Sequence, residues 1–142
     1  MQEIGAHIDQ SDPVTEAADR KADVVQFFLG DPQSWKEPVL PPVDVSGLSF
    51  FVHAPYVINV ASSNNKIRIP SRKILDNHVA AATALGARGL VVHGGHVTKG
   101  EDPAVGIANW VKTLERASLT LPVLVETSAF SSELVLSNRG DA

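Results

Sequence analysis

Five short apolar segments alternate with helix-forming segments along most of this chain. They run from Glu3 to Ile8, Ala22 to Gly30, Leu48 to Val57, Arg88 to His96 and Leu121 to Thr127. Segments of this length that are rich in β-branched and aromatic residues are typical of buried strands. Strands that alternate with helices and are apolar on both faces predict an α/β fold with a parallel sheet covered by helices.

Helix starts lie between the expected strands. Pro13 and Pro103 each follow an Asp and suit the first helical position, where a backbone N–H is not needed. Another helix, the second along the chain, is expected to begin at Ser71, directly after a proline, and to end at Gly86. The segment Trp35–Gly47 contains three prolines, so we expect an irregular connection there.

Apolar residues at helical spacing predict which faces of the second and third helices are buried. In the helix from Ser71 they are Ile74, Leu75, Val79 and Leu85, and in the helix from Pro103 they are Ile107, Trp110, Val111 and Leu114. His78 is expected at the surface of its helix.

Composition limits the chemistry. The chain has 142 residues, a formal net charge of −4 and no cysteine, so any metal must be held by His, Asp or Glu. The sequence shows no apolar stretch of membrane-spanning length and no signal-peptide layout, so we expect a cytoplasmic protein with no membrane partner. The mildly acidic balance argues against a general nucleic-acid coat, although a local basic patch can still bind phosphate.

A polar, metal-capable or acidic residue lies at or near the end of each expected strand. In order along the chain these are His7, Asp31, His53, His93 and Glu126. The carboxyl ends of parallel strands lie on one side of the sheet, and in a βα barrel that side carries the active site. These side chains are therefore expected to converge in space.

His53, His93 and Glu126 form the set of two imidazoles and one carboxylate that binds zinc and leaves a fourth position open. The alternative is that each histidine is a hydrogen-bonded structural residue. His7 is interpreted as a group that supports the ligands or faces the substrate. His96 is interpreted as either a supporting group or a residue that only bonds backbone in the glycine loop.

A basic segment lies between the third strand and the second helix. It extends from Asn59 to Lys73 without an acidic residue and contains Lys66, Arg68, Arg72 and Lys73. These cations could neutralise phosphates, or they could belong to a solvated loop and first helical turn. Tyr56 could stack on a base or only pack against the protein.

Several motifs, taken in order, resemble the endonuclease IV family of zinc-dependent apurinic/apyrimidinic endonucleases. They are "IGAH", "VVQFFLGDPQSW", "VHAPYVINVAS", "RIPSRK", "LGARGLVVHGGH" and "PVLVET". The resemblance covers residues 4–126 and corresponds to the N-terminal half of the family. It implies a (β/α)8 TIM barrel, of which this chain would form the first four to five βα units with parallel strands.

The resemblance also implies a function in base-excision repair. The family uses three zinc ions to cut the DNA backbone 5′ to an abasic site. Its matching residues make His53, His93 and Glu126 the ligands of one zinc, with Glu126 reaching a second ion and serving as the candidate catalytic residue. Tyr56 and Val57 match positions that the family inserts into bent DNA, and Lys66, Arg68 and Arg72 are further candidate DNA contacts.

The chain also departs from the family pattern. We divide it into residues 1–126, the endonuclease IV-like part, and residues 127–142, a divergent tail without the family's remaining Asp, His and Glu ligands. An Arg of some family members is replaced by Gln33 or Ser34. The helix expected after the second strand is replaced by the proline-rich segment.

A (β/α)8 barrel needs at least about 200 residues, and this chain accommodates about four and a half units. We therefore expect it to be a truncated or frameshifted product that is poorly stable, self-associating or dependent on a missing segment, although the full-length family is monomeric. We expect the chain to bind one zinc ion weakly and to cleave abasic DNA inefficiently. Two alternatives remain: a sugar isomerase or epimerase of the xylose-isomerase-like group, and a non-enzymatic, flavodoxin-like α/β domain.

Overall fold

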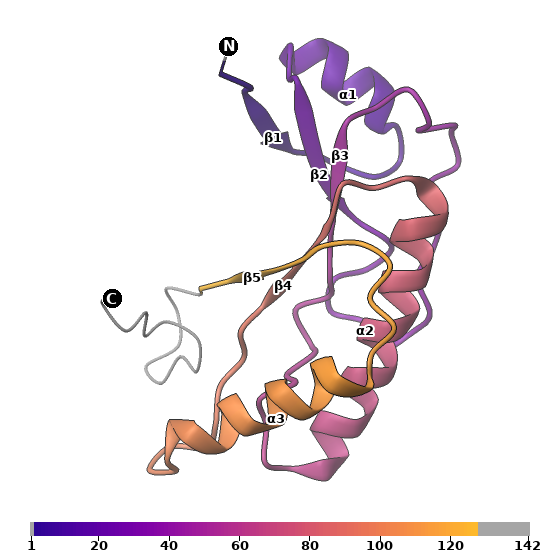
Figure 1. Ribbon diagram of the computed structural model, residues 1–142. Helices are drawn as coiled ribbons and strands as arrows, with labels where there is room; N and C mark the ends of the chain where they lie inside the picture. Colours follow the sequence, from indigo (N-terminus) through magenta and orange to yellow (C-terminus); the bar gives the residue numbers. More distant parts are fainter. Residues whose placement is uncertain (1, 128–142) are drawn as a thin grey trace.

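The strands are arranged side by side in the order in which they occur along the chain (Figure 1). The computed structural model describes residues 2–127. All strand pairs are parallel, and the sheet order is β1-β2-β3-β4-β5. The elements are β1 (Gly5–His7), α1 (Pro13–Arg20), β2 (Val24–Phe28), β3 (Phe50–His53), α2 (Asn65–Leu85), β4 (Leu90–His93), α3 (Pro103–Arg116) and β5 (Val123–Glu126).

This order confirms the predicted partial (β/α)8 barrel. Successive parallel strands joined by right-handed crossovers place their helices on one side of the sheet, and α1 and α2 lie on the same side in Figure 1. A flavodoxin-like sheet has the order 2-1-3-4-5, so the flavodoxin-like alternative is wrong. The divergent tail lies outside the described residues except for Thr127.

The helix-facing side of the sheet forms the core. Its alternate positions carry apolar side chains that are at most 2% exposed: Val25 and Phe27 of β2, Phe50 and Val52 of β3, and Leu90 and Val92 of β4. The rings of Phe27 and Phe50 stack with their centroids 5.2 Å apart. Burying one such side chain stabilises the fold by about 1.5–3 kcal/mol. Ile74, Leu75 and Val79 of α2 are buried in the same cluster, as their spacing predicted.

The opposite side of the sheet carries the candidate functional residues. Register places Phe28 beside His53, His53 beside Val91, and Val91 beside Leu124, so these side chains form one row across four strands. His93 is paired with Glu126, two residues beyond the Val91 and Leu124 pair and on the same side of the sheet. The sheet therefore sorts its residues into a packed core side and a more exposed site side.

Helix α2 begins six residues before the predicted start at Ser71. The side chain of Asn64 accepts a hydrogen bond from the backbone N–H of Lys66 (3.0 Å) and caps the helix. Pro70 lies within the helix, where it removes one backbone donor without ending the helix. The basic segment from Asn59 to Lys73 therefore lies largely in the first turns of α2.

Two predictions about helix faces are wrong. His78 is only 1% exposed, because it lies one turn beyond Ile74 on the buried face of α2 and its Nδ1 is 3.0 Å from the Ile74 carbonyl oxygen. In α3, Trp110 is 2% exposed, but Ile107, Val111 and Leu114 are 43–48% exposed. The buried face of α3 is formed by Gly106, Asn109, Trp110 and Thr113.

The connection from β2 to β3 contains no helix, as the prolines predicted. The strands are also shorter than the apolar segments: β2 ends at Phe28, so Asp31 lies in the following loop, and β3 ends at His53. In the described part of the chain, no helix is both long and apolar enough to cross a membrane.

Candidate metal centre

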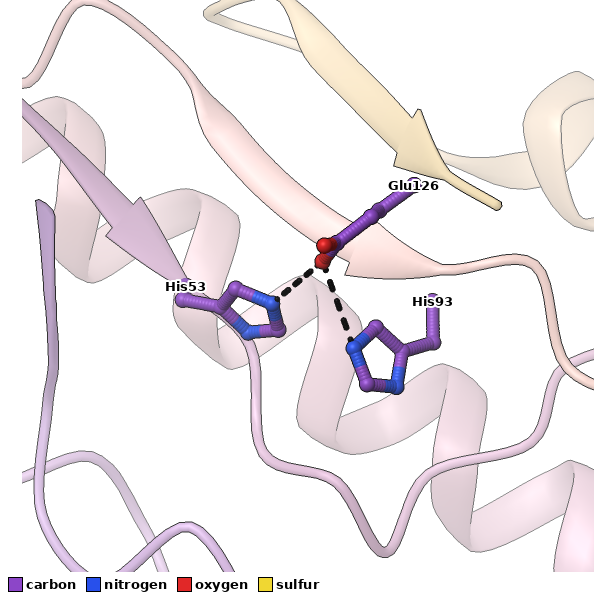
Figure 2. A group of neighbouring side chains, drawn as sticks. All are labelled: His53, His93 and Glu126. Atoms are coloured by element: carbon purple, nitrogen blue, oxygen red, sulfur yellow. Dashed lines mark hydrogen bonds and ion pairs between the residues drawn. The ribbon is translucent and has the colours of Figure 1, made fainter. Parts of the chain in front are cut away.

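Three strand ends bring His53, His93 and Glu126 together, as the sequence predicted (Figure 2). His53 Nε2 lies 2.9 Å from Glu126 Oε2, and His93 Nε2 lies 3.3 Å from the same oxygen. One ligand atom from each residue lies within 4.8 Å of the other two. In Figure 2 both imidazoles point toward the carboxylate.

The tautomer of His53 suits a metal ligand. Its Nδ1 lies 2.7 Å from the carbonyl oxygen of Ala54, an atom that can only accept, so Nδ1 carries the proton. Nε2 is then the nitrogen that faces Glu126 and that is available to bind a metal ion. A backbone carbonyl that orients the far nitrogen of an imidazole is the usual support for a metal-bound histidine.

Charge and burial favour the deprotonated ligand forms. Hydrogen bonding to His53, followed by the charges of both histidines, lowers the pKa of Glu126. Burial, followed by the neighbouring His53, lowers the pKa of His93. A metal ion needs an ionised carboxylate and neutral imidazoles, so these shifts fit a cation among the three residues.

Aromatic rings surround the two imidazoles. The Tyr56 ring stacks on His93 at 5.2 Å between centroids, and His53 meets His93 edge-on at 5.0 Å. Phe28 contacts His53 at 5.1 Å and Tyr56 at 5.0 Å. These contacts restrict the rotation of both imidazoles.

His7 and His96 lie outside the group of three. The Nδ1 of His7 is 2.9 Å from Gln26 Nε2, and its ring packs edge-on against Phe28 at 4.9 Å. Burial, followed by the neighbouring His53, lowers the pKa of His7. His96 has an exposed side chain and is fixed through its backbone.

The candidate DNA-binding residues have different environments. Tyr56 is 51% exposed, and Val57 packs partly against the core. Lys66 is exposed on α2. Arg68 donates to the carbonyl oxygens of Ser62 and Ser63 and contacts Asn65, and Arg72 is partly buried. Arg68 therefore has a structural role in holding the loop before α2.

Sequence reasoning missed three residues around the site: Phe28, Asn59 and Trp110. Phe28 separates His7 from His53 and contacts both rings. Asn59 and Trp110 hydrogen-bond the loop that follows His93. The available signal for Asn59 was a lone amide inside the apolar run "YVINVA", since a buried amide requires polar partners.

The donor set fits zinc. Two imidazole nitrogens face one carboxylate oxygen, and the Nδ1–H of His53 donates a hydrogen bond to the Ala54 carbonyl oxygen. A cation among them would satisfy all three acceptors together. Two histidines and one glutamate are a known zinc ligand set with an open position.

Comparison with known proteins agrees with the fold. The family model described as xylose isomerase-like TIM barrel matches residues 14–127. The chain therefore belongs to the xylose isomerase-like TIM barrel family.

Within that family, the similar curated proteins are named "Probable endonuclease 4". The protein from Mycobacterium bovis (strain BCG / Pasteur 1173P2) is 48% identical over 131 residues, which cover 89% of this chain and 52% of the relative. A relative from Mycobacterium leprae (strain TN) is 48% identical over 130 residues with the same coverage. The resemblance to endonuclease IV is confirmed, and the chain spans about half the length of these relatives.

Solved structures show the same architecture. The crystal structure of endonuclease IV from Thermus thermophilus has a TM-score of 0.75 at 26% identity, covering 94% of this chain and 55% of that chain. A D-tagatose 3-epimerase-like protein has a TM-score of 0.67 at 14% identity, covering 94% of this chain and 55% of that chain. The second likeness concerns the fold only.

Proposed function

We propose that this chain carries the first metal-binding part of an endonuclease IV-type DNA repair site. The observation that carries the proposal is the convergence of His53, His93 and Glu126 within 4.8 Å, on a chain that is 48% identical to proteins named "Probable endonuclease 4". The substrate is DNA with abasic sites, and the reaction is hydrolysis of the phosphodiester 5′ to the lesion.

His53, His93 and Glu126 would hold one zinc ion. Zinc supplies a Lewis acid for chemistry at a phosphate. The chain's own contribution is to orient the donors: the Ala54 carbonyl fixes the His53 ring, and Tyr56 covers one face of the His93 ring. Glu126 presents a carboxylate that both imidazoles approach.

DNA would approach from the same edge of the sheet. Tyr56 is half exposed beside the metal group, which places an aromatic surface where an unstacked nucleotide could rest. A hollow of about 470 Å³ is lined by Phe28, His7, Gly30 and Pro32 among others. Lys66, Arg72 and Val57 complete the proposed contact surface, with Arg68 as a support of the loop.

The site on this chain is expected to bind zinc weakly and to cut DNA inefficiently. The described residues contain one group of three donors, and the relatives are about twice as long as the matched region. Phosphodiester cleavage by clustered zinc ions requires more ligands than one such group provides.

Calorimetric titration of the purified chain with zinc tests the site. We expect one zinc ion per chain, and we expect binding to be lost in His53→Ala and retained in His96→Ala, which removes an exposed imidazole outside the group. A wild-type chain that binds no zinc would contradict the proposed metal site.

Incision of a duplex with one abasic site tests the activity. We expect slow, zinc-dependent cutting 5′ to the lesion and none of an undamaged duplex. Rapid zinc-dependent cutting would contradict the view that one metal group is insufficient. Cutting that persists in His53→Ala would show that another site is responsible.

A further inference from the structure

The loop that follows His93 is held by hydrogen bonds from three directions. The Gly94 N–H donates to the Glu126 carbonyl oxygen at 3.1 Å, and the Trp110 indole N–H donates to the Gly94 carbonyl oxygen at 2.7 Å. The Asn59 side chain pairs with His96: its Oδ1 accepts from the His96 N–H at 3.1 Å, and its Nδ2 donates to the His96 carbonyl oxygen at 2.9 Å. The course of the backbone directly after His93 is therefore fixed.

Asn59 differs from the other two anchors because one side chain satisfies both backbone groups of a single residue. This pairing copies the hydrogen bonds that a neighbouring strand would make and permits only one orientation of the amide. Asn59 is 9% exposed, so a lost partner would leave a buried polar group unpaired.

The backbone of Asn59 is fixed in turn by α2. Its N–H donates to Ser71 Oγ at 2.8 Å, and the Ser71 hydroxyl donates to the Ile67 carbonyl oxygen at 2.6 Å. Ser71 is fully buried. A continuous chain of hydrogen bonds thus runs from α2 through Ser71 and Asn59 to the loop after His93.

Gly95 allows the close approach of this loop to Asn59. Its φ is +73°, which an L side chain rarely adopts, and a Cβ at this position would overlap Asn59 Oδ1. Gly95 is therefore matched to the Asn59 amide.

We propose that Asn59 is a positioning residue for His93. Its side-chain hydrogen bonds go to the His96 backbone and not to the imidazole. They set the path of residues 94–96 and so the direction in which the chain leaves β4 after His93. The proposal rests on the proposed function in one respect, that His93 is a zinc ligand. Ligand geometry must hold within about 0.5 Å for good metal affinity, so a shift of this loop is expected to weaken zinc binding.

Asn59→Ala and Asn109→Ala form a matched pair for the test. Asn109 is also a buried amide, 8% exposed, and its side chain donates two hydrogen bonds, to the carbonyl oxygens of Ala61 and Ser62, and none to residues 94–96. We expect zinc affinity of the full chain to fall about 10–100-fold in Asn59→Ala and less than about threefold in Asn109→Ala. Urea denaturation reports the stability loss of each variant.

Equal losses of zinc affinity in the two variants, in proportion to their losses of stability, would overturn the proposal, since Asn59 would then act as an ordinary buried amide. If Asn59→Ala does not yield folded protein, Asn59→Asp provides the second variant. It keeps the acceptor for the His96 N–H and the side-chain volume but removes the donor to the His96 carbonyl oxygen.

A readout on the metal-free chain separates this proposal from the proposed function. The ring 1H–13C signals of His93, assigned by their absence in His93→Ala, should shift in Asn59→Ala or Asn59→Asp and stay in place in Asn109→Ala. Unchanged His93 signals in the Asn59 variants would overturn the positioning role whether or not zinc binds. Shifted signals in a chain that binds no zinc would retain the positioning role and reject the zinc site.

Discussion

The ends of β3 and β5 hold their candidate ligands with very different firmness. His53 is 3% exposed, lies between neighbours on both sides, and is fixed through Ala54 and Phe28. Glu126 lies on the edge strand of the described sheet, its side chain is 50% exposed, and Leu124 of the same strand is 42% exposed. The core therefore pre-organises His53 but not Glu126.

The difference indicates where zinc affinity is limited. Ordering a long carboxylate side chain when the metal binds costs up to about 1.5–2 kcal/mol of conformational entropy. The His53 side chain is already ordered by its packing in the folded chain. Contacts that cover β5 would reduce this cost for Glu126. Strengthening the packing of β5 should therefore raise zinc affinity more than any change at β3.

The largest expected effect contrasts the core with β5. Phe27→Ala removes a fully buried ring stacked on Phe50 and should lower the free energy of unfolding by about 3–5 kcal/mol. Leu124→Ala on β5 should cost less than about 1 kcal/mol, because that side chain is already partly in water. Urea denaturation followed by circular dichroism measures both, and equal losses would show that β5 is as well packed as β2.

A second contrast concerns zinc affinity. His53→Ala should weaken zinc binding by at least about 100-fold, since even residues that only support metal ligands contribute 10–100-fold. Glu126→Gln should cost less, on the order of tenfold, because its exposed side chain keeps one oxygen acceptor. Competition with a coloured zinc chelator gives both values. If Glu126→Gln were the more damaging change, the proposed weakness of β5 would be wrong.

The buried His78 predicts a dependence of stability on pH. Burial lowers its pKa from the ordinary value of 6.5, so at the same pH the folded chain binds less proton at this group than the unfolded chain does. Stability should therefore fall as the pH drops below about 6.5, with a slope of at most about 1.4 kcal/mol per pH unit for this group. This pH dependence arises from the buried face of α2, on the core side of the sheet.

Unfolding free energies measured from pH 7.5 to pH 5 in about half-unit steps would check this. The slope of wild type should exceed that of His78→Gln. Identical slopes in the two proteins would show that His78 is protonated to the same extent folded and unfolded.

The smallest expected effect on stability lies on the outer face of α3. Ile107 and Val111 are 44% and 48% exposed, so Ile107→Lys combined with Val111→Glu should change the free energy of unfolding by about 0.5 kcal/mol or less per site. The same pair should reduce the expected self-association of the chain, because it interrupts an exposed apolar surface. Sedimentation velocity at several concentrations measures the association, and Lys112→Glu on the same exposed side provides the control.

The five strands and their order along the chain could be predicted because each lies within a short apolar run, although the observed strands are shorter than these runs. This placed His53, His93 and Glu126 at one edge, and the structure brings them together. The proline-rich connection between β2 and β3 could be predicted for a local reason, since proline restricts its own backbone. Both features depend only on residues near each other in the sequence.

Other features depend on tertiary contacts and could not be predicted in this way. Pro70 looked like a helix boundary, but Asn64 caps α2 earlier and the helix continues through the proline. The apolar residues of α3 suggested a buried stripe, whereas Asn109 and Thr113 turn inward and the Asn109 amide finds two loop carbonyls. Asn59 became informative only once the loop after His93 was placed beside it.

The sequential order of the strands has a consequence for synthesis. Each strand from β2 to β5 pairs with the strand that precedes it in the chain, so no strand waits for a partner that is made later. As the chain leaves the ribosome, every new βα unit can dock on an edge that already exists, and domains emerging N-terminal first can begin to fold during synthesis. The candidate metal group is complete only when Glu126 arrives on β5, so a metal ion held by all three residues would stabilise the five-stranded sheet and not its earlier intermediates.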